Sequence, residues 1–239
     1  MEEPHATGGT GLLSKAFLPE FVYGGIDGAI TTFAVVAGST GANLDIPVVI
    51  ILGFANLIAD GFSMSVGNFF STKAEIDNYD KHKATEYWEV ENLRETEVEE
   101  IRSIYRRKGF TGELLEQVVE VITSDKEVWV DTMMKEELEL SKDHKSPYQT
   151  AGMTFGSFLL IGFIPLAAYV FALLFDTSKD SLFLYACLLT GLALSIIGAL
   201  KSTVNNKNVL QGIAETLSLG GIAAILAYFV GDVLENLFR

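Results

Sequence analysis

The chain of 239 residues has a hydrophobic content of 49%, a charged content of 20% and a net charge of −14. This acidity argues against nucleic acid as a partner, because phosphate binding requires clustered lysine and arginine. The single cysteine, Cys187, cannot form an intramolecular disulfide, which excludes a disulfide-stapled secreted domain. The charge is concentrated in residues 71–149, which hold 20 acidic and 12 basic residues, whereas the apolar stretches on either side are nearly uncharged.

Five stretches are long and apolar enough to cross a membrane, which takes about 20 mostly apolar residues. They are residues 21–38, 46–70, 151–175, 181–200 and 209–230. Residues 1–20 lack the features of a cleaved signal peptide, so we expect a cytosolic tail there. The sequence predicts an all-α polytopic membrane protein, with two transmembrane helices in residues 21–72 and three in residues 149–239.

The positions of lysine and arginine predict an orientation. Lys15, the acidic insert, Lys201 and Lys207 fall on one side of a five-span chain, and the opposite loops are poor in basic residues. Because basic segments stay in the cytosol, we expect a cytosolic N-terminus and insert, and a C-terminus on the luminal side.

Residues 73–148 between the second and third spans are expected to form a soluble acidic domain of about three helices. Lys73–Arg107 contains no glycine or proline and is predicted to be one helix, continuous with the second span. Helices over Glu113–Ile122 and Glu127–Leu140 follow, with Thr111 at the start of the first and Ser124 or Asp125 capping the second.

Ionisable residues inside a span are costly and are therefore candidate functional groups. Asp27 lies in the first span. The second span carries a row at four-residue spacing, consisting of Asn56, Asp60, Met64 and Asn68. The row is either a contact between helices or a cation path, and a thioether beside oxygen donors suits a late first-row transition metal.

Two further glutamates lie near span ends. Glu215 in the fifth span is expected near the cytosolic end, where it reaches water. Glu20 precedes the first span and is a candidate proton or cation relay at its mouth.

The insert contains a sharper pattern, made of four glutamates: Glu86, Glu89, Glu97 and Glu100. On one continuous helix, at about 100° per residue, they would share a face about 80° wide. Like charges at these spacings destabilise an isolated helix, so the pattern indicates a cation site. The structural alternative is a face neutralised by Arg94, Arg102 and Arg106.

The third insert helix adds Met133, Met134, Glu136 and Glu137. Helices that project carboxylates into a shared core build multi-metal sites in helical bundles. The Glu-x-x-His motif of di-iron bundles is missing, and His5, His82 and His144 lie outside the clusters. A carboxylate and methionine site without histidine suits delivery of a metal better than its storage.

The segments YGGIDGAITTFAVVAGSTGA and GFANLIADGFSMSVGNFFSTKAE resemble the vacuolar iron transporter family, particularly its plant members. The similarity extends from about Glu20 to the end of the chain and includes the insert, which shorter relatives lack. It departs at two positions. Many members carry glutamate where this chain has Asn56 and a small residue where it has Asp60, so the charge of the pathway is left open.

The resemblance implies a homodimer with five spans per protomer and a cytosolic metal-binding domain. Asp27 and Met64 match metal-contacting positions in a pathway between protomers. The ligands of the cytosolic domain would be Glu86, Glu89, Glu97, Glu100, Met133, Met134 and Glu137.

From these residues we expect a transporter, not an enzyme. It would be a proton-coupled antiporter in the vacuolar membrane that moves ferrous iron, with manganese, cobalt and zinc as alternative substrates, and that has no prosthetic group. The expected partners are lipid, divalent cations, protons and a second copy of the chain. Two other interpretations stay open: a membrane-anchored carboxylate-bridged iron oxidase or storage bundle, and a scaffold whose insert binds a protein.

Overall fold

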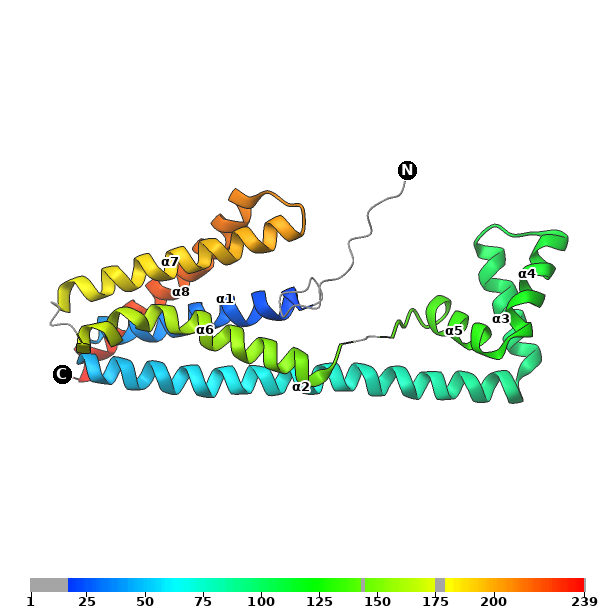
Figure 1. Ribbon diagram of the computed structural model, residues 1–239, viewed down its shortest axis with the longest axis horizontal. Coiled ribbons are helices and arrows are strands. Elements are labelled where there is room, and N and C mark those ends of the chain that lie inside the picture. Colours follow the sequence, from blue (N-terminus) through cyan, green and yellow to red (C-terminus); the bar gives the residue numbers. More distant parts are fainter. Residues whose placement is uncertain (1–16, 143–144, 175–178, 239) are drawn as a thin grey trace. The chain divides into compact units, whose positions relative to one another are not determined.

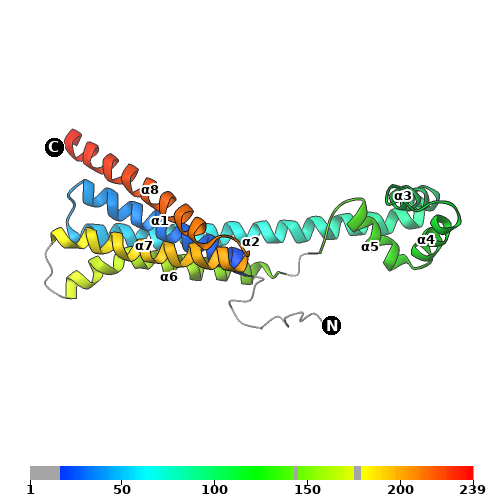
Figure 2. The same cartoon turned by 90° about the horizontal axis from the view of Figure 1, so that it is seen from above.

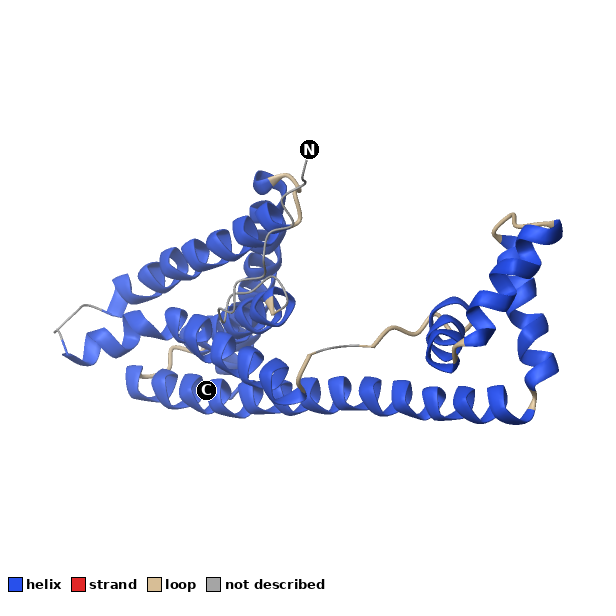
Figure 3. Ribbon diagram, turned by 45° about the vertical axis from the view of Figure 1, so that its right-hand side comes forward, coloured by secondary structure: helices blue, strands red, loops and turns tan. Residues whose placement is uncertain are grey.

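The computed structural model describes residues 17–142, 145–174 and 179–238, and this part of the chain consists of helices joined by loops (Figures 1 and 3). It has eight helices and no strand, which confirms the prediction of an all-α protein. Their bounds are α1 Leu18–Gly41, α2 Ile46–Asn92, α3 Arg94–Arg107, α4 Gly112–Ser124, α5 Lys126–Glu136, α6 Pro147–Leu174, α7 Lys179–Val204 and α8 Val209–Phe238.

The chain divides into two compact units. The first, called here the span unit, consists of Met1–Phe69 and Ser146–Arg239, and the second, called the insert, is Phe70–Lys145. Their boundary falls inside α2, which runs without interruption from Ile46 to Asn92, as the absence of a helix breaker predicts.

Five helices, α1, α2, α6, α7 and α8, are long and apolar enough to cross a membrane. At 1.5 Å per residue, even a helix of 24 residues such as α1 spans about 36 Å, more than a hydrocarbon core of roughly 30 Å. The prediction of five membrane-spanning helices is therefore confirmed by length and composition.

Small residues bring the helices of the span unit together, and Figure 2 shows α1 among its neighbours. A methyl group added at Gly28 of α1 would lie 2.5 Å from the carbonyl oxygen of Phe158 in α6. One added at Gly231 of α8 would lie 2.0 Å from the carbonyl oxygen of Gly38 in α1. Such close backbone approach is how helices associate in lipid, and it makes α1 the centre of the unit.

The insert has its own hydrophobic core. Residues from α2 to α5 contribute to it, and its fully buried members include Ile101, Trp129, Val130 and Met133. Of the two predicted caps, Ser124 and Asp125, it is Asp125 that caps α5, because its Oδ1 accepts hydrogen bonds from the backbone N–H groups of Glu127 and Val128 at 2.9 and 3.2 Å.

The prediction of one helix over residues 73–107 is wrong, because the helix breaks at Leu93. The φ and ψ angles of Leu93 are −123° and 33°, and its carbonyl oxygen accepts the N–H groups of Thr96 and Glu97. The chain turns sharply there (Figure 3), and α3 then contributes Ile101 and Ile104 to the core. Closure of this core overrides a local sequence that favours helix.

The third insert helix also ends earlier than predicted, at Glu136 instead of Leu140. The backbone N–H of Leu138 bonds to the carbonyl oxygen of Met133 at 3.2 Å, a six-to-one bond typical of a helix C-terminus. Leu138 and Leu140 then pack against the core, so their apolar side chains belong to the segment that follows the helix.

Candidate functional site

Five carboxylates of the insert interact with one another, and we call them the carboxylate cluster. They are Glu86 and Glu89 of α2, Glu97 and Glu100 of α3, and Glu137, which follows the last residue of α5. The prediction placed the first four on one face of a single helix. That helix does not exist, and the break at Leu93 instead lets two helices each contribute a pair.

Two members of the carboxylate cluster occupy core positions. Glu86 is 4% exposed and Glu97 is 3% exposed. Glu97 precedes the buried Ile101 and Ile104 at the spacing of a helix face, where an apolar residue is expected. Two acidic residues at such positions cost stability, so the arrangement favours a role in binding over a role in packing.

The environment raises the pKa of these buried carboxyls. Burial is the main cause for both, and it raises the pKa of Glu86 and of Glu97 from 4.5 to about 7. The neighbouring carboxylates add to this effect, with Glu137 the strongest on Glu86 and Glu100 the strongest on Glu97. Glu86 and Glu97 therefore exchange protons near neutral pH, where metal and proton compete for the same oxygens.

One buried oxygen of Glu86 and one of Glu97, both Oε2, have no hydrogen-bond partner among the described residues. The pKa of Glu137 is also raised, mainly by burial and then by the charge of Glu100 and a hydrogen bond with it, and the positive charge of Arg107 offsets only part of this. In the described part of the chain, no three histidine, cysteine or acidic side chains lie close enough together to hold a metal ion as they stand. Binding at the cluster would require its side chains to move together.

Met133 and Met134, the predicted sulfur ligands, are 0% and 1% exposed and belong to the core of the insert. Both lie on α5, one turn or less before Glu137. Glu86 and Glu97 are buried in the same unit. Met133 and Met134 therefore pack in the core, and their role as metal ligands stays a prediction.

The basic residues expected to neutralise the glutamate face have other partners. Arg102 binds Glu116 through Nε and Nη2, both at 2.9 Å, and also pairs with Glu99. The guanidinium of Arg94 lies 4.8 Å from the ring centre of Trp129. Arg107 is the basic residue whose charge lowers the pKa of Glu137. The sequence did not indicate this interaction, because the two residues come from different segments of the insert.

In the span unit, Asp27 of α1 and Asp60 of α2 are half-buried and interact electrostatically. The rest of the polar row on α2 has other contacts. Asn56 donates to the hydroxyl of Thr31 in α1 at 3.4 Å, and Asn68 donates to that of Thr154 in α6 at 2.6 Å. The two asparagines therefore join helices, which separates them in role from Asp60.

The other two predicted pathway residues, Met64 and Glu20, lie on α2 and α1. Met64 is half-buried and packs against the core of the span unit. Glu20 lies in the first turn of α1.

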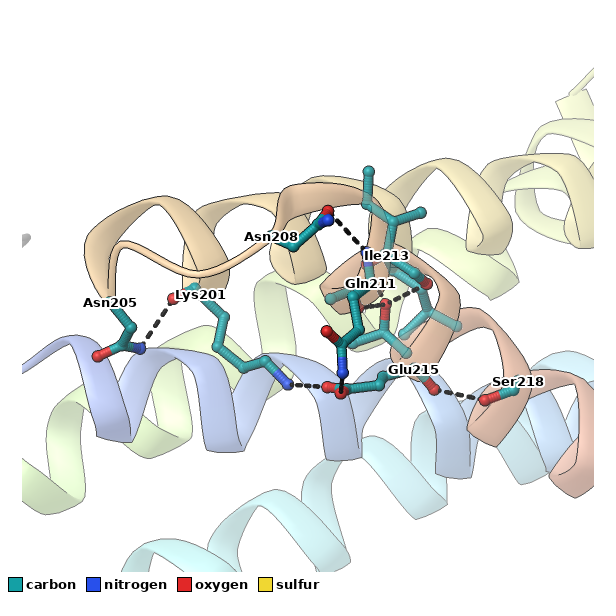
Figure 4. Close-up of polar contacts among 10 residues, drawn as sticks. Lys201, Asn205, Asn208, Gln211, Ile213, Glu215 and Ser218 are labelled. Carbon is teal, nitrogen blue, oxygen red and sulfur yellow. Dashed lines mark hydrogen bonds and ion pairs between the residues drawn. The ribbon is translucent and has the colours of Figure 1, made fainter.

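Glu215 has the contacts expected of a residue near water. Figure 4 shows its carboxylate beside Lys201 of α7, at 3.0 Å, and beside the side-chain amide of Gln211, at 3.3 Å. The side chains of Lys201 and Glu215 are 36% and 50% exposed, so this ion pair joins α7 and α8 at their turn.

The sequence is similar to those of known proteins from one family. A sequence model described as the VIT family matches residues 18–232. A "Vacuolar iron transporter" of Toxoplasma gondii is 35% identical over 228 residues, covering 93% of this chain and 76% of the relative. That of Plasmodium falciparum is 34% identical over 230 residues, covering 94% and 84%. A "Vacuolar iron transporter 1" of Arabidopsis thaliana is 30% identical over 218 residues, covering 91% and 86%. The chain therefore belongs to the VIT family, the family of the vacuolar iron transporters.

Proposed function

We propose that this protein moves ferrous iron from the cytosol into a vacuole in exchange for protons. Iron transport is supported by the names of its relatives and by the five membrane-spanning helices. Exchange for protons, transport of manganese, cobalt or zinc, and the vacuolar location are our proposal.

The observation that carries the proposal is the electrostatic interaction of Asp27 with Asp60, which lie on two different spans. Two interacting carboxylates inside a membrane are costly unless a cation or a proton offsets their charge. They therefore provide a place where Fe²⁺ and protons replace each other. Met64, one turn beyond Asp60 on α2, adds a sulfur donor that a late first-row metal accepts.

In this scheme the carboxylate cluster of the insert collects the cation. Hard and borderline divalent cations bind carboxylate oxygens, and the cluster holds two buried oxygens with no other described partner. Met133 and Met134 would favour iron over magnesium or calcium, because the latter two cations do not bind thioethers. Glu20 and Asn56 would line the entrance and the wall of the path.

The pathway would lie between two protomers. The face of α2 in the span unit carries exposed apolar side chains, among them Ile51, Ile58 and Phe62, at 67%, 56% and 62% exposure. This face suits either lipid or a second copy of the chain. The basic residues of the insert and of the α7–α8 turn favour a cytosolic location for both, with the C-terminus in the lumen.

The test is ferrous iron uptake into sealed proteoliposomes that contain the full chain, with and without an imposed pH gradient. We expect uptake that rises with the gradient and is lost in Asp27→Asn, which keeps the shape of the side chain and removes its charge. Asp232→Asn is the matched control, because Asp232 is an exposed carboxylate near the end of α8.

Unchanged uptake in Asp27→Asn would reject the proposed pathway. Absence of uptake together with oxidation of ferrous iron by the purified chain would instead favour the carboxylate-bridged oxidase. Oxygen consumption is recorded in the same preparations, because transport alone consumes none.

A further inference from the structure

The span unit contains a large cavity away from Asp27, Asp60 and Met64. Its volume is about 770 Å³, and its walls come mainly from α7 and α8. The helices α7 and α8 diverge from their connecting turn in both views (Figures 1 and 2). Ile225 and Phe229 at its edge are 71% and 66% exposed, so the cavity opens on the surface of the unit.

The side chains that line the cavity are mostly apolar. Four residues with hydroxyl groups line the cavity. Thr40, Tyr169 and Thr190 use theirs in hydrogen bonds, and the fourth is Tyr228. Thr40 donates to the carbonyl oxygen of Val36 at 2.8 Å, so Tyr169 donates to Thr40 at 2.9 Å. Thr190 donates to the carbonyl oxygen of Ala186 at 2.7 Å. Because these three groups are satisfied and the remaining lining is mostly apolar, water gains little by entering, and an apolar guest is favoured.

The depth of the cavity matches one leaflet of a bilayer. Its lining on α7 runs from Leu182 to Leu194, and its lining on α8 runs from Leu217 to Phe229. Twelve steps of 1.5 Å on each helix give about 18 Å. Half of a hydrocarbon core of roughly 30 Å is about 15 Å. The cavity thus begins near the α1–α2 connection, where Asn43 and Leu44 line it, and ends near the middle of the membrane.

We propose that this cavity binds one acyl chain of a phospholipid from the leaflet on the side of the α1–α2 connection. A lipid tail has the required chemistry and length and is the apolar molecule present at highest concentration beside α7 and α8. The exposed side chains of Asn43 and Tyr228 lie at the end where the ester and head group would sit. The bound chain fills the space between α7 and α8 and supports their packing against α1.

Two glycines make the cavity testable. A methyl group added at Gly221 has no neighbour within 4 Å, and one added at Gly191 has only Leu217, at 3.9 Å. Both glycines line the cavity. Because the first side-chain atom meets no close neighbour at either position, we expect Gly221→Leu or Gly191→Leu to narrow the cavity while the helices stay in place. Ile222→Phe is the matched control. Ile222 follows Gly221, is 57% exposed and does not line the cavity, so this substitution adds bulk outside it.

The experiment uses the full chain in vesicles of phosphatidylcholine that contain a small fraction of the same lipid with a photoreactive diazirine in mid-chain. After illumination, labelled residues are mapped by mass spectrometry. We expect label on the cavity-lining Phe183 and Cys187 as well as on the outward Leu188 and Leu192. Gly221→Leu should lose the inward label and keep the outward label, whereas Ile222→Phe keeps both.

Inward label that persists in Gly221→Leu and in Gly191→Leu would overturn the proposal. So would inward positions labelled only by a photoreactive sterol, or inward positions that crosslink to a second copy of the chain. Elution as a single species and an unchanged thermal midpoint in detergent establish that each variant is folded. If Gly221→Leu fails this check, Gly191→Leu decides.

Discussion

The carboxyl groups of Glu86 and Glu97 interact across the break at Leu93, although they lie on different helices and are both almost fully buried. Each keeps an oxygen without a hydrogen-bond partner in the described part of the chain. A buried pair of this kind is unfavourable in the ionised state and is relieved by a proton or by a cation. The pH should therefore control both the affinity of the insert for metal and its stability.

Metal affinity should rise with pH. Because the pKa values of Glu86 and Glu97 are raised to about 7, a divalent cation must displace protons from them below neutral pH. Binding of Mn²⁺ to the full chain, measured by calorimetry in detergent, should strengthen as pH rises from about 5.5 to 7 and level off above that. The double variant Glu86→Gln/Glu97→Gln should bind weakly and show a flat profile.

The stability of the insert should show the opposite dependence when a chelator is present. The folded-state pKa values of Glu86 and Glu97 are higher than the ordinary value of 4.5, so the folded state binds more protons between pH 4.5 and 7. The free energy of unfolding should fall as pH rises through this window. Trp88 and Trp129 are the only tryptophans and both lie in the insert, so their fluorescence reports its unfolding.

The control for both pH experiments is Glu95→Gln. Glu95 is an exposed acidic residue on the same helix as Glu97. If Glu86→Gln/Glu97→Gln has the pH profile of the wild type and Glu95→Gln has a different one, the effect belongs to surface charge and not to the buried pair.

Removal of the Asp60 charge should slow transport. Asp60 is the carboxylate that interacts with Asp27, so Asp60→Asn removes the negative charge beside Asp27. We expect lower uptake of ferrous iron and a weaker response to an imposed pH gradient. Uptake is measured in proteoliposomes, beside Asp232→Asn as a control of equal charge change. An unaltered gradient response in Asp60→Asn would show that Asp60 takes no part in proton exchange.

Gly28→Ala should destabilise the span unit. The added methyl group would lie 2.5 Å from the backbone oxygen of Phe158, so α1 and α6 must separate. Overpacking of this kind typically costs about 1–3 kcal/mol. Thermal aggregation in detergent, followed by size-exclusion chromatography, should begin at a lower temperature. Gly152→Ala is the control on α6, because a methyl group there has no neighbour within 4 Å. Equal behaviour of the two variants would contradict this account of helix contact.

Arg102→Lys should weaken the insert modestly. The guanidinium of Arg102 binds both oxygens of Glu116 at 2.9 Å and so joins α3 to α4, and a lysine ammonium cannot reproduce this two-point contact. We expect a loss of roughly 1 kcal/mol or less, because the pair is partly exposed. Urea unfolding followed by tryptophan fluorescence measures it. Arg106→Lys is the control, since Arg106 lies 3.8 Å from Glu99 and makes no such fork. A loss that is the same in both variants would assign the effect to helix propensity.

The spans could be predicted from the sequence because a membrane selects for length and apolar composition, and both can be read directly. The cap at Asp125 could be predicted because it is a local interaction between neighbouring residues. The break at Leu93 could not, since residues 73–107 contain no glycine or proline and the break arises from packing of Ile101 and Ile104 in the core. Local signals do not report such long-range contacts.

The sequence did not predict how the candidate residues are placed relative to one another. The spacing of Glu86, Glu89, Glu97 and Glu100 selected four carboxylates that do interact, but it assumed a single helix. The electrostatic interaction between Asp27 and Asp60 depends on how α1 and α2 are placed in the span unit, which no pattern along one helix contains. The partners of Arg102 were equally hidden, because surface ion pairs contribute too little energy to constrain the sequence.

The two ends of the insert differ in how they tolerate a change of length. The chain enters it inside α2, so one residue added between Phe70 and Asn92 turns every later residue of that helix by about 100°. It leaves through Ser141–Lys142 and Lys145–Ser146, which are not helical, lie beyond the core-packed Leu140 and can gain or lose a residue without such a rotation. Natural insertions and engineered tags should therefore accumulate at the exit and be rare at the entrance, where only changes of a whole number of turns preserve the register.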